Sequence, residues 1–344
     1  MNFFSRLESI MAMKKRITIT DIAKAVGTSV TTVSFILNGK AKERRISDMV
    51  NKRVLEYVKK VGYKPSQLVR NAPGGQTRVL ALLAEDLNNP FVSEVGRHIE
   101  RIASGLGYHI VYCNTGDDTQ KINQFVRLCI DKEIDGVFMM PSDDLEETIL
   151  KIKKQRIPVV FFDRFIPTLD TPYVISDNRK GAYEATKYLL EIGSRRVGLV
   201  SLYSNQTQMR ARLDGYMDAM DEFQQQSFIR KLSVDGPEDE VGEQIVSFIV
   251  DNKLDAILFA NHYLAIGGLK AMKGKTNVFP QMATFDDHVL FELHMPAISV
   301  VMQDGKAVAA ELMQILMAEI DGNLRGECKV VIPCTLLIRE APTS

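Results

Sequence analysis

Short, continuous apolar runs alternate with amphipathic helical segments over most of the chain, and this alternation restricts the fold more than any other feature. A run that is apolar at every position predicts a strand buried on both faces, as in a parallel sheet. The stretches between most runs repeat apolar residues every three or four positions, which predicts helices. The runs are residues 79–84, 108–113, 136–140, 158–163, 196–201, 255–260 and 297–302. The alternation predicts doubly wound α/β units with right-handed crossovers.

Charge divides the chain near residues 71–77, where one proline and two glycines stand together without apolar periodicity. Residues 1–76 contain 15 Lys and Arg against 5 Asp and Glu, whereas residues 77–344 contain 28 against 38. The two halves are therefore +10 and −10, and they cancel in the net charge of zero. A basic segment of this size favours a module that binds a polyanion, because neutralising phosphates releases counterions. A solvated basic tail is the alternative.

Composition and motifs argue against several classes of protein. No apolar run reaches the ~18–20 residues of a membrane helix, and Arg6 and Glu8 stand where a signal peptide is apolar. We therefore expect a cytoplasmic protein that does not associate with membranes. The four cysteines and five histidines lack the spacing of metal ligands, and no nucleophile motif, P-loop or dinucleotide fingerprint occurs. We expect no catalytic residues, no metal and no cofactor.

Two helix starts lie close together in residues 18–39, TITDIAKAVGTSVTTVSFILNG. Thr18 opens a T-x-x-D capping signature, and Gly27 is suited to end the first helix. Ser29 can cap a second helix, so that only two residues separate the pair. Such a tight Gly turn between short helices is typical of a helix-turn-helix. A third helix over residues 47–62 completes the predicted three-helix core.

These segments resemble the DNA-binding head of the lac repressor (LacI) family of bacterial transcription regulators. TDIAKAVGTSVTTVSFILNG and RVLEYVKKVGYKP combine the double cap, the Gly turn, the T-V-S run and the closing G-Y-x-P. The resemblance implies a head at residues 13–63 and a hinge at 64–76; residues 1–12 match nothing in the family, which makes Met13 a candidate start. The implied DNA-contacting residues are Thr18, Ser29, Val30, Thr31, Thr32, Ser34, Phe35, Asn38, Tyr63, Leu68 and Ala72.

By this resemblance, Val30, Thr31 and Phe35 read bases in the major groove, while hydroxyl and amide side chains contact phosphates. Phe35 stands where many relatives carry Arg, so we expect apolar contact with a thymine methyl in place of a bidentate guanine contact. The loop at 40–46 is longer and more basic than usual, and either adds phosphate contacts or is a solvated charge run. Ala72 replaces the family's leucine wedge and precedes a proline, which predicts weak kinking of the operator.

Residues 77–344 resemble the family's effector-binding core, which is similar to periplasmic sugar-binding proteins. The resemblance implies two α/β lobes, at about 77–175 plus 304–331 and at about 176–302, with three chain crossings between them. Ligands of open α/β sheets bind beyond the carboxyl ends of the strands, so residues that follow strands are the candidates. The expected effector contacts are Phe91, Asp163, Arg164, Arg212, Asn261, Asp286 and Gln303.

The candidate side chains in the cleft offer carboxylates, amides, guanidinium groups and one aromatic face, which suit a polyhydroxylated ligand. An interlobe salt bridge or a helix cap is the alternative role, most of all for Arg164. His262 stands where relatives often have Asp, which is compatible with an anionic group on the effector.

The sequence thus predicts a sequence-specific DNA-binding transcription regulator, a homodimer whose affinity for a pseudo-palindromic operator is controlled by a sugar-like effector. Repression is the expected activity, and activation stays open because it depends on where the operator lies. A solute-binding protein without DNA regulation is the competing class, against which the basic head and the missing signal peptide both argue. An enzyme on the same scaffold would need a catalytic constellation that the sequence lacks.

Overall fold

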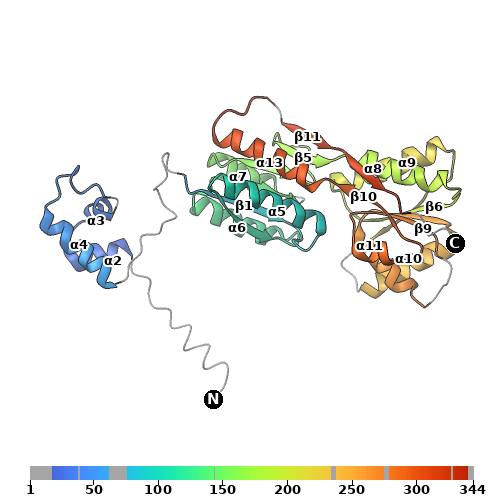
Figure 1. The fold of residues 1–344 in the computed structure, drawn as a ribbon, viewed down its shortest axis with the longest axis horizontal. Coiled ribbons are helices and arrows are strands. Elements are labelled where there is room, and N and C mark those ends of the chain that lie inside the picture. Colours follow the sequence, from blue (N-terminus) through green and yellow to red (C-terminus); the bar gives the residue numbers. More distant parts are fainter. Residues whose placement is uncertain are drawn as a thin grey trace, which may run out of the picture. The chain divides into compact units, whose positions relative to one another are not determined.

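The computed structural model divides the chain into two compact units, Met1–Gly75 and Gln76–Ser344. Figure 1 shows the helices and strands of both. The residues that the structure describes are 18–37, 39–61, 76–142, 144–233, 238–274, 279–326 and 328–339.

The described residues of the first unit, 18–37 and 39–61, form three helices. They are α2 (Ile19–Val26), α3 (Val30–Leu37) and α4 (Asp48–Val61). Ile22, Val33 and Val54, one from each helix, are completely buried in a common apolar core. The predicted three-helix head is therefore confirmed.

The first lobe of the second unit is a six-stranded sheet in which every pair of neighbours is parallel. In sheet order its strands are β11 (Lys329–Ile332), β5 (Tyr173–Ser176), β4 (Val159–Phe162), β3 (Gly136–Met139), β1 (Val79–Ala84) and β2 (His109–Asn114). Its helices are α5 (Pro90–Gly105), α6 (Thr119–Asp131), α7 (Glu146–Lys154) and α13 (Gly305–Ile320).

Both faces of this sheet are covered by helices. Leu80 and Leu82 of β1 pack in a cluster with α5 and α13, whereas Leu83 packs in a second cluster with α6 and α7. Leu312 and Leu316 of α13 are completely buried in the first cluster. A strand apolar at every position is thus explained by burial on two sides, as predicted for most of the runs.

The second lobe repeats this architecture with one antiparallel strand. In sheet order its strands are β12 (Cys334–Leu337), β10 (Ser299–Gln303), β9 (Gln281–Phe285), β8 (Ala256–Phe259), β6 (Val197–Leu202) and β7 (Phe228–Leu232). Its helices are α8 (Asn178–Glu191), α9 (Thr207–Glu222), α10 (Glu238–Asp251), α11 (His262–Met272) and α12 (Val289–Leu293). Only β12 runs antiparallel, alongside β10. The two-lobed α/β core with mostly parallel sheets is confirmed.

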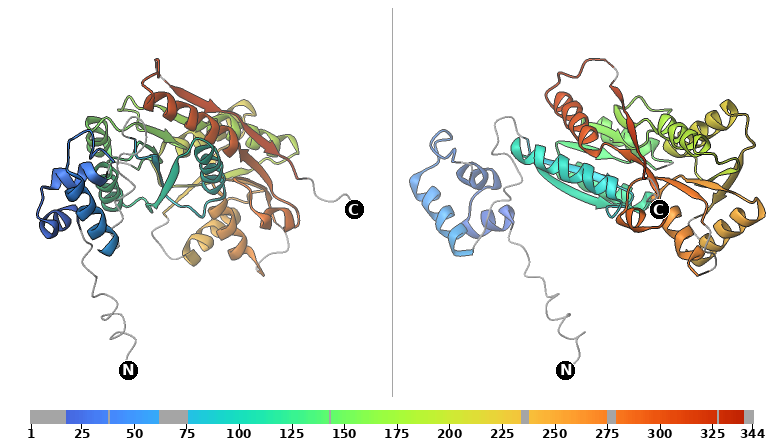
Figure 2. Two further views of the ribbon diagram at one scale, coloured as in Figure 1. Left: turned by 60° about the vertical axis from the view of Figure 1, so that its left-hand side comes forward. Right: turned by 45° about the vertical axis from the view of Figure 1, so that its right-hand side comes forward.

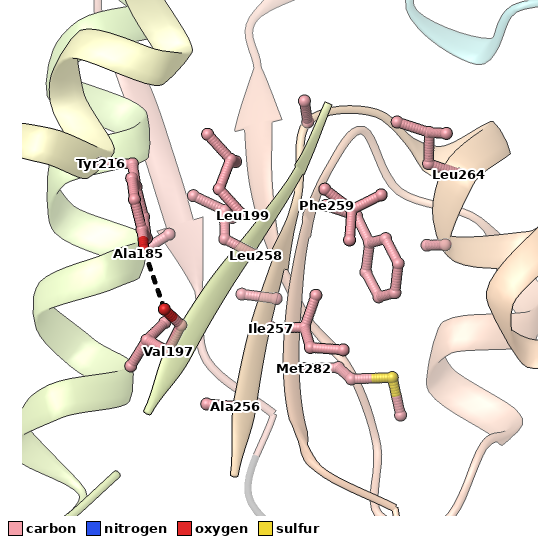
Figure 3. Packing of buried hydrophobic residues seen from close by; sticks show 14 of the residues in the cluster. Ala185, Val197, Leu199, Tyr216, Ala256, Ile257, Leu258, Phe259, Leu264 and Met282 are labelled. Carbon is pink, nitrogen blue, oxygen red and sulfur yellow. Dashed lines mark hydrogen bonds between the residues drawn. The ribbon is translucent and has the colours of Figure 1, made fainter. Parts of the chain in front are cut away.

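Tyr216 anchors α9 to the core of the second lobe. Its ring is completely buried, and its hydroxyl donates to the Val197 carbonyl oxygen at 2.8 Å. Figure 3 shows Leu199 and Leu258 on the side of the sheet toward Tyr216, and Ile257 and Met282 on the other side. The satisfied hydroxyl allows a tyrosine to occupy an apolar core without a desolvation penalty.

Helices α8 and α9 pack backbone against backbone. A Cβ atom at Gly215 would lie 2.0 Å from the Arg179 carbonyl oxygen, so only glycine fits this crossing. One turn further on, Asp218 accepts two hydrogen bonds from the Arg179 guanidinium, at 2.6 and 2.9 Å. The close approach brings the middle of α9 next to the start of α8.

Three crossings connect the lobes, and each consists of a single residue. Asp177 lies between β5 and α8, Asp304 between β10 and α13, and Pro333 between β11 and β12. Asp177 caps α8 by accepting from the Lys180 N–H at 3.1 Å, and Asp304 caps α13 by accepting from the Ala307 N–H at 2.8 Å. Figure 2 shows the red C-terminal strands running from one lobe into the other.

The strand predictions differ from the structure at the sheet edges. The run at 108–113 was expected to be buried on both faces, which is wrong: β2 is an edge strand, and Val111 and Tyr112 are exposed. Strands β7, β11 and β12, which lie at sheet edges, and β5, which lies next to the edge strand β11, are also present, although their sequences do not form fully apolar runs. Edge strands contact one neighbour and need less apolar surface, so hydrophobic runs identify them poorly.

Candidate functional site

Two caps and one glycine fix the geometry of the helix-turn-helix. Thr18 and Asp21 form a capping box: the Asp21 N–H donates to Thr18 Oγ1 at 3.2 Å, and the Thr18 N–H donates to Asp21 Oδ2 at 2.9 Å. Gly27 ends α2 with φ of 66°, in the left-handed region that glycine adopts without strain. The Thr28 N–H then donates to the Ala23 carbonyl at 3.0 Å, which closes a Schellman turn.

Helix α3 presents one polar and one apolar face. Ser29 caps it by accepting from the Thr32 N–H at 3.0 Å, while Val33 and Ile36 are buried in the core. On the opposite face Val30 and Thr31 are exposed, and Thr32, Ser34 and Phe35 are half-buried. This surface brings together the predicted DNA contacts on α3. Asn38, Tyr63, Leu68, Ala72, the candidate start Met13 and nearly all of the hinge lie outside the described residues.

The basic loop after α3 is partly built into the core of the head. Ala41 is buried and Ile46 half-buried, and the Ile46 N–H donates to the Ala41 carbonyl at 2.9 Å. The Arg44 guanidinium lies over the Phe35 ring, with 4.8 Å between the guanidinium carbon and the ring centroid. The sequence predicted that this loop either contacts phosphates or is a solvated charge run. Neither prediction includes the packing of part of the loop against the core of the head.

A cleft of about 730 Å³ lies between the two lobes of the second unit. It lies within the ~300–1,000 Å³ usual for small-molecule sites. All seven predicted effector contacts line it, and they come from both lobes: Phe91, Asp163, Arg164, Arg212, Asn261, Asp286 and Gln303. The strand-end rule therefore located side chains that the fold brings together from six separate segments.

Asp163 and Asp286 occupy equivalent positions in the two lobes. Each follows directly on a central strand, β4 or β9, and each has a left-handed backbone, with φ of 67° and 65°. Both side chains line the cleft although they are largely buried, with 7% and 6% of the residue surface exposed. Left-handed backbone at a non-glycine residue costs energy and is concentrated at functional sites.

Comparison with known proteins agrees with both units. Residues 18–66 match the family model of bacterial regulatory proteins of the lacI family, and residues 80–324 match the periplasmic binding protein domain. The DegA transcriptional regulator of Bacillus subtilis is 28% identical over 336 residues, covering 94% of this chain and 97% of DegA. This chain belongs to the LacI family. It is therefore a DNA-binding transcription regulator and not an enzyme.

Two further comparisons extend the likeness to the whole LacI-family architecture. The ribose operon repressor of Halalkalibacterium halodurans is 28% identical over 332 residues, which covers 94% of this chain and 96% of the repressor. The structure of a periplasmic binding protein/LacI regulator from Alkaliphilus metalliredigens, complexed with D-xylulofuranose, matches with a TM-score of 0.68. At 22% identity, covering 78% of this chain and all of that one, the match shows the fold alone.

Two features are absent from the described residues: a helix that could span a membrane and a group of side chains that could hold a metal ion. No helix in the described ranges is both long and apolar enough to cross a membrane. Among the same residues, no cluster of His, Cys, Asp and Glu has the geometry to hold a metal ion.

The two aspartates of this LacI-family cleft differ in the direction in which their pKa is shifted. Burial raises the pKa of Asp163 to about 6, against the opposing effect of Arg164 and Arg212. Burial also raises the pKa of Asp286, but the nearby His262 imidazole, Arg212 and a hydrogen bond from Gln303 lower it further, so that it ends below its usual value. Gln303 Nε2 donates to Asp286 Oδ1 at 2.7 Å. Asp163 carboxylate oxygens accept no hydrogen bond from any residue the structure describes, and its nearest cation is Arg164 at 4.0 Å.

The three other polar candidates already have protein partners. Arg164 donates to Glu85 at 2.7 Å, to Asp117 at 2.9 Å and to the Pro141 carbonyl at 2.6 Å. Arg212 donates through Nε to Asn178 Oδ1 at 2.7 Å. Asn261 caps α11 by accepting from the Leu264 N–H at 2.9 Å. The salt-bridge and helix-cap alternatives therefore describe contacts that these residues make in the cleft.

Several residues of the cleft were not predicted. Glu85 and Asp86 directly follow β1, and the strand-end rule applied to that run would have found them. Gln206 also lines the cleft and was harder to find, because its contact with Asp117 joins the lobes across 89 residues of sequence: Gln206 Nε2 donates to Asp117 Oδ2 at 3.0 Å. Tyr263 makes a second contact between the lobes, since its hydroxyl donates to Asp86.

His262 is buried beside the cleft. Its Nδ1 lies 3.8 Å from Asp286 Oδ2 and has no hydrogen-bond partner among the described residues. The ring packs against Tyr263 with 3.9 Å between centroids. These contacts associate His262 with Asp286 and do not favour an anionic group on the ligand.

Replacing Asp163 by Asn is expected to stabilise the unliganded core at pH 7.5 by up to about 3 kcal/mol, the equivalent of a pKa raised from 3.8 to about 6. The folded state holds this proton more tightly than the unfolded state, so the wild type loses stability as pH rises through about 6. Asn tolerates the left-handed backbone. Thermal unfolding at pH 5 and pH 7.5 measures the effect: the gain in Tm should be larger at pH 7.5, and equal gains at both would contradict the assignment.

Proposed function

We propose that this protein represses transcription as a cytoplasmic homodimer bound to a pseudo-palindromic operator, and that a neutral sugar bound in the core controls its affinity for DNA. In this proposal residues 13–63 are the DNA-binding head and residues 64–76 the hinge. Residues 77–344 are the effector-binding and dimerisation core. A regulator that binds the chromosome works in the cytoplasm.

The observation that carries the effector proposal is the surplus of hydrogen-bond acceptors in the cleft. Asp163 accepts no hydrogen bond, and Gln208 Oε1 and Gln303 Oε1 are buried without a partner in the described part of the chain. Among the donors, the Nε and both terminal nitrogens of Arg164 already bind Pro141, Glu85 and Asp117. A ligand that completes this site must donate hydrogen bonds, as sugar hydroxyls do and phosphate or carboxylate groups do not.

The apolar part of the cleft supports the same ligand class. Phe91, Val92, Met140 and Met209 line it beside the acceptors. A pyranose or furanose ring has apolar C–H faces between its hydroxyls and can contact both kinds of surface. The relative from Alkaliphilus metalliredigens holds D-xylulofuranose, which is consistent with a sugar at the corresponding place here.

Thermal stability tests the ligand class. Neutral mono- and disaccharides would be screened together with their phosphates and uronic acids for a rise in Tm of the full chain. A sugar at 100 times its Kd should add about 2.7 kcal/mol to the free energy of unfolding. We expect such a rise from a neutral sugar and not from its anionic counterpart.

The homodimer is supported by the head and by one surface of the core. A single α3 can reach only a few base pairs, and two heads related by a two-fold axis double the contact and match a symmetric operator. On and after α12, Val289, Leu290, Leu293 and Met295 are all exposed, with 71% of the Leu293 surface accessible. An apolar cluster of this kind is typical of an interface.

Thr31→Ala is expected to weaken binding to the operator by ~1–3 kcal/mol with little effect on random DNA. Thr31 is exposed at the start of α3, where a helix in the major groove meets base edges. Titration of labelled operator and of a scrambled duplex measures both affinities. Equal losses on the two duplexes would show that Thr31 positions the helix and does not read bases.

Asp286→Asn is expected to leave operator affinity within about threefold of wild type and to abolish the response to the effector. Asp286 lies in the cleft of the core, and the substitution removes an ionised acceptor while keeping its shape. Asp287→Asn is the matched control, because Asp287 pairs with Arg339 at 2.8 Å and does not line the cleft. Operator titrations with and without the sugar decide the matter: a normal response in Asp286→Asn would place the effector elsewhere.

A further inference from the structure

The recognition face of the head contains a guanidinium group that does not come from helix α3. None of the eight residues of α3, VTTVSFIL, is charged or carries an amide side chain. Thr31 and Phe35 are four residues apart and lie one above the other on the same helix face. Arg44, from the loop between α3 and α4, lies over the Phe35 ring, with the guanidinium carbon 4.8 Å from the ring centroid. It therefore extends the face that begins with Thr31.

The loop holds Arg44 in this place by contacts at both of its ends. The Lys40 N–H donates to the Phe35 carbonyl at 2.9 Å, which ties the start of the loop to α3. The Arg44 N–H donates to the Lys40 carbonyl at 3.1 Å, and the buried Ala41 fixes the segment between them to the core. The fold thus determines where the Arg44 backbone lies.

The other loop cations lack such a setting. Lys42 and Arg45 are exposed, and in the part of the head that the structure describes they have no ion pair and no ring contact. They can add charge near a phosphate backbone, but nothing orients them. Arg44 differs because its guanidinium lies against the Phe35 ring, which limits the positions that it can take.

A guanidinium stacked on a ring keeps its edge free for hydrogen bonds in the plane of the stack. Two parallel N–H groups on that edge match the O6 and N7 acceptors of guanine in the major groove. We propose that Arg44, positioned by Phe35, reads a guanine within each half-site, so that helix and loop form one base-reading surface. The proposal rests on the proposed placement of α3 in the major groove.

The test is a binding-site selection with full-length protein on a library of random duplexes, for the wild type and Arg44→Lys. Lysine keeps the charge but lacks the planar pair of donors. The wild type should select a symmetric motif with a guanine that Arg44→Lys no longer requires. On the wild-type motif, Arg44→Lys should bind about 5- to 150-fold more weakly, with binding to scrambled DNA unchanged.

Arg45→Lys is the matched variant, since it makes the same chemical change one residue away. It should select the same bases as the wild type. The proposal is overturned if Arg44→Lys also selects the wild-type motif, or if it weakens binding to the motif and to scrambled DNA by the same factor. If the wild type selects no motif at all, the base-reading role of α3 fails, and with it the proposed operator. Circular dichroism melts of the variants verify that the head is folded.

Discussion

Raising the salt concentration from 50 to 200 mM is expected to weaken operator binding by ~10³–10⁵-fold, the loss that follows from roughly 6–10 phosphate contacts. Within residues 18–61 the chain has nine Lys and Arg against four Asp and Glu. Each cation that neutralises a phosphate releases a counterion, and added salt opposes that release. Fluorescence anisotropy of a labelled operator over a salt series measures the slope.

Two controls accompany this titration. Circular dichroism at both salt concentrations should show the same folded protein, because the helical core of the head is apolar. Scrambled DNA should give a steep slope as well, since the phosphate contacts carry no sequence information. A change of less than tenfold over this range would mean that the basic segment is a solvated surface and not a DNA-binding one.

Gly215→Ala is expected to destabilise the core by about 3 kcal/mol or more, which lowers Tm by about 6–12 °C. The added Cβ would stand 2.0 Å from the Arg179 carbonyl oxygen, and backbone cannot move aside as a flexible side chain can. Separating α9 from α8 would also lengthen the 2.7 Å hydrogen bond from Arg212 to Asn178. The effector should therefore bind more weakly to whatever folded protein remains.

Gly267→Ala is the matched control for this substitution. Gly267 also lies inside a helix, α11, but a Cβ there meets no atom within 4 Å. Alanine should therefore stabilise the protein by up to about 1 kcal/mol through its helix propensity. Thermal unfolding of the two variants distinguishes the steric clash of the added Cβ from the effect of alanine on helix propensity. Similar shifts in Tm for both variants would contradict the backbone contact at Gly215.

The head could be predicted almost completely from sequence because its determinants are local. The capping box at Thr18 and the left-handed Gly27 act within a few residues, and the apolar periodicity of each helix is unbroken. The contact between Arg44 and Phe35 was not predicted. It depends on how the loop folds back on α3, which no local pattern specifies.

The core was predictable in its centre and less so at its edges and in its cleft. Central strands are apolar throughout, and residues after them, such as Asp163 and Asp286, fall in the cleft because parallel strands end at one edge. Which side chains these residues contact depends on how closely the two lobes approach each other. The sequence shows that Gln206 follows a strand, but not that it meets Asp117.

The path of the chain through the lobes also sets an order of assembly during synthesis. Lobe one begins at β1, yet its core includes Leu312 and Leu316 of α13, and its edge strand β11 begins at Lys329. The ribosome makes these segments after the whole sequence from α8 to β10. The lobe translated first therefore waits for its last elements until nearly all of lobe two has been made, since only β12 of lobe two follows β11. Until α13 is made, the face that it covers is open to chaperones or to aggregation.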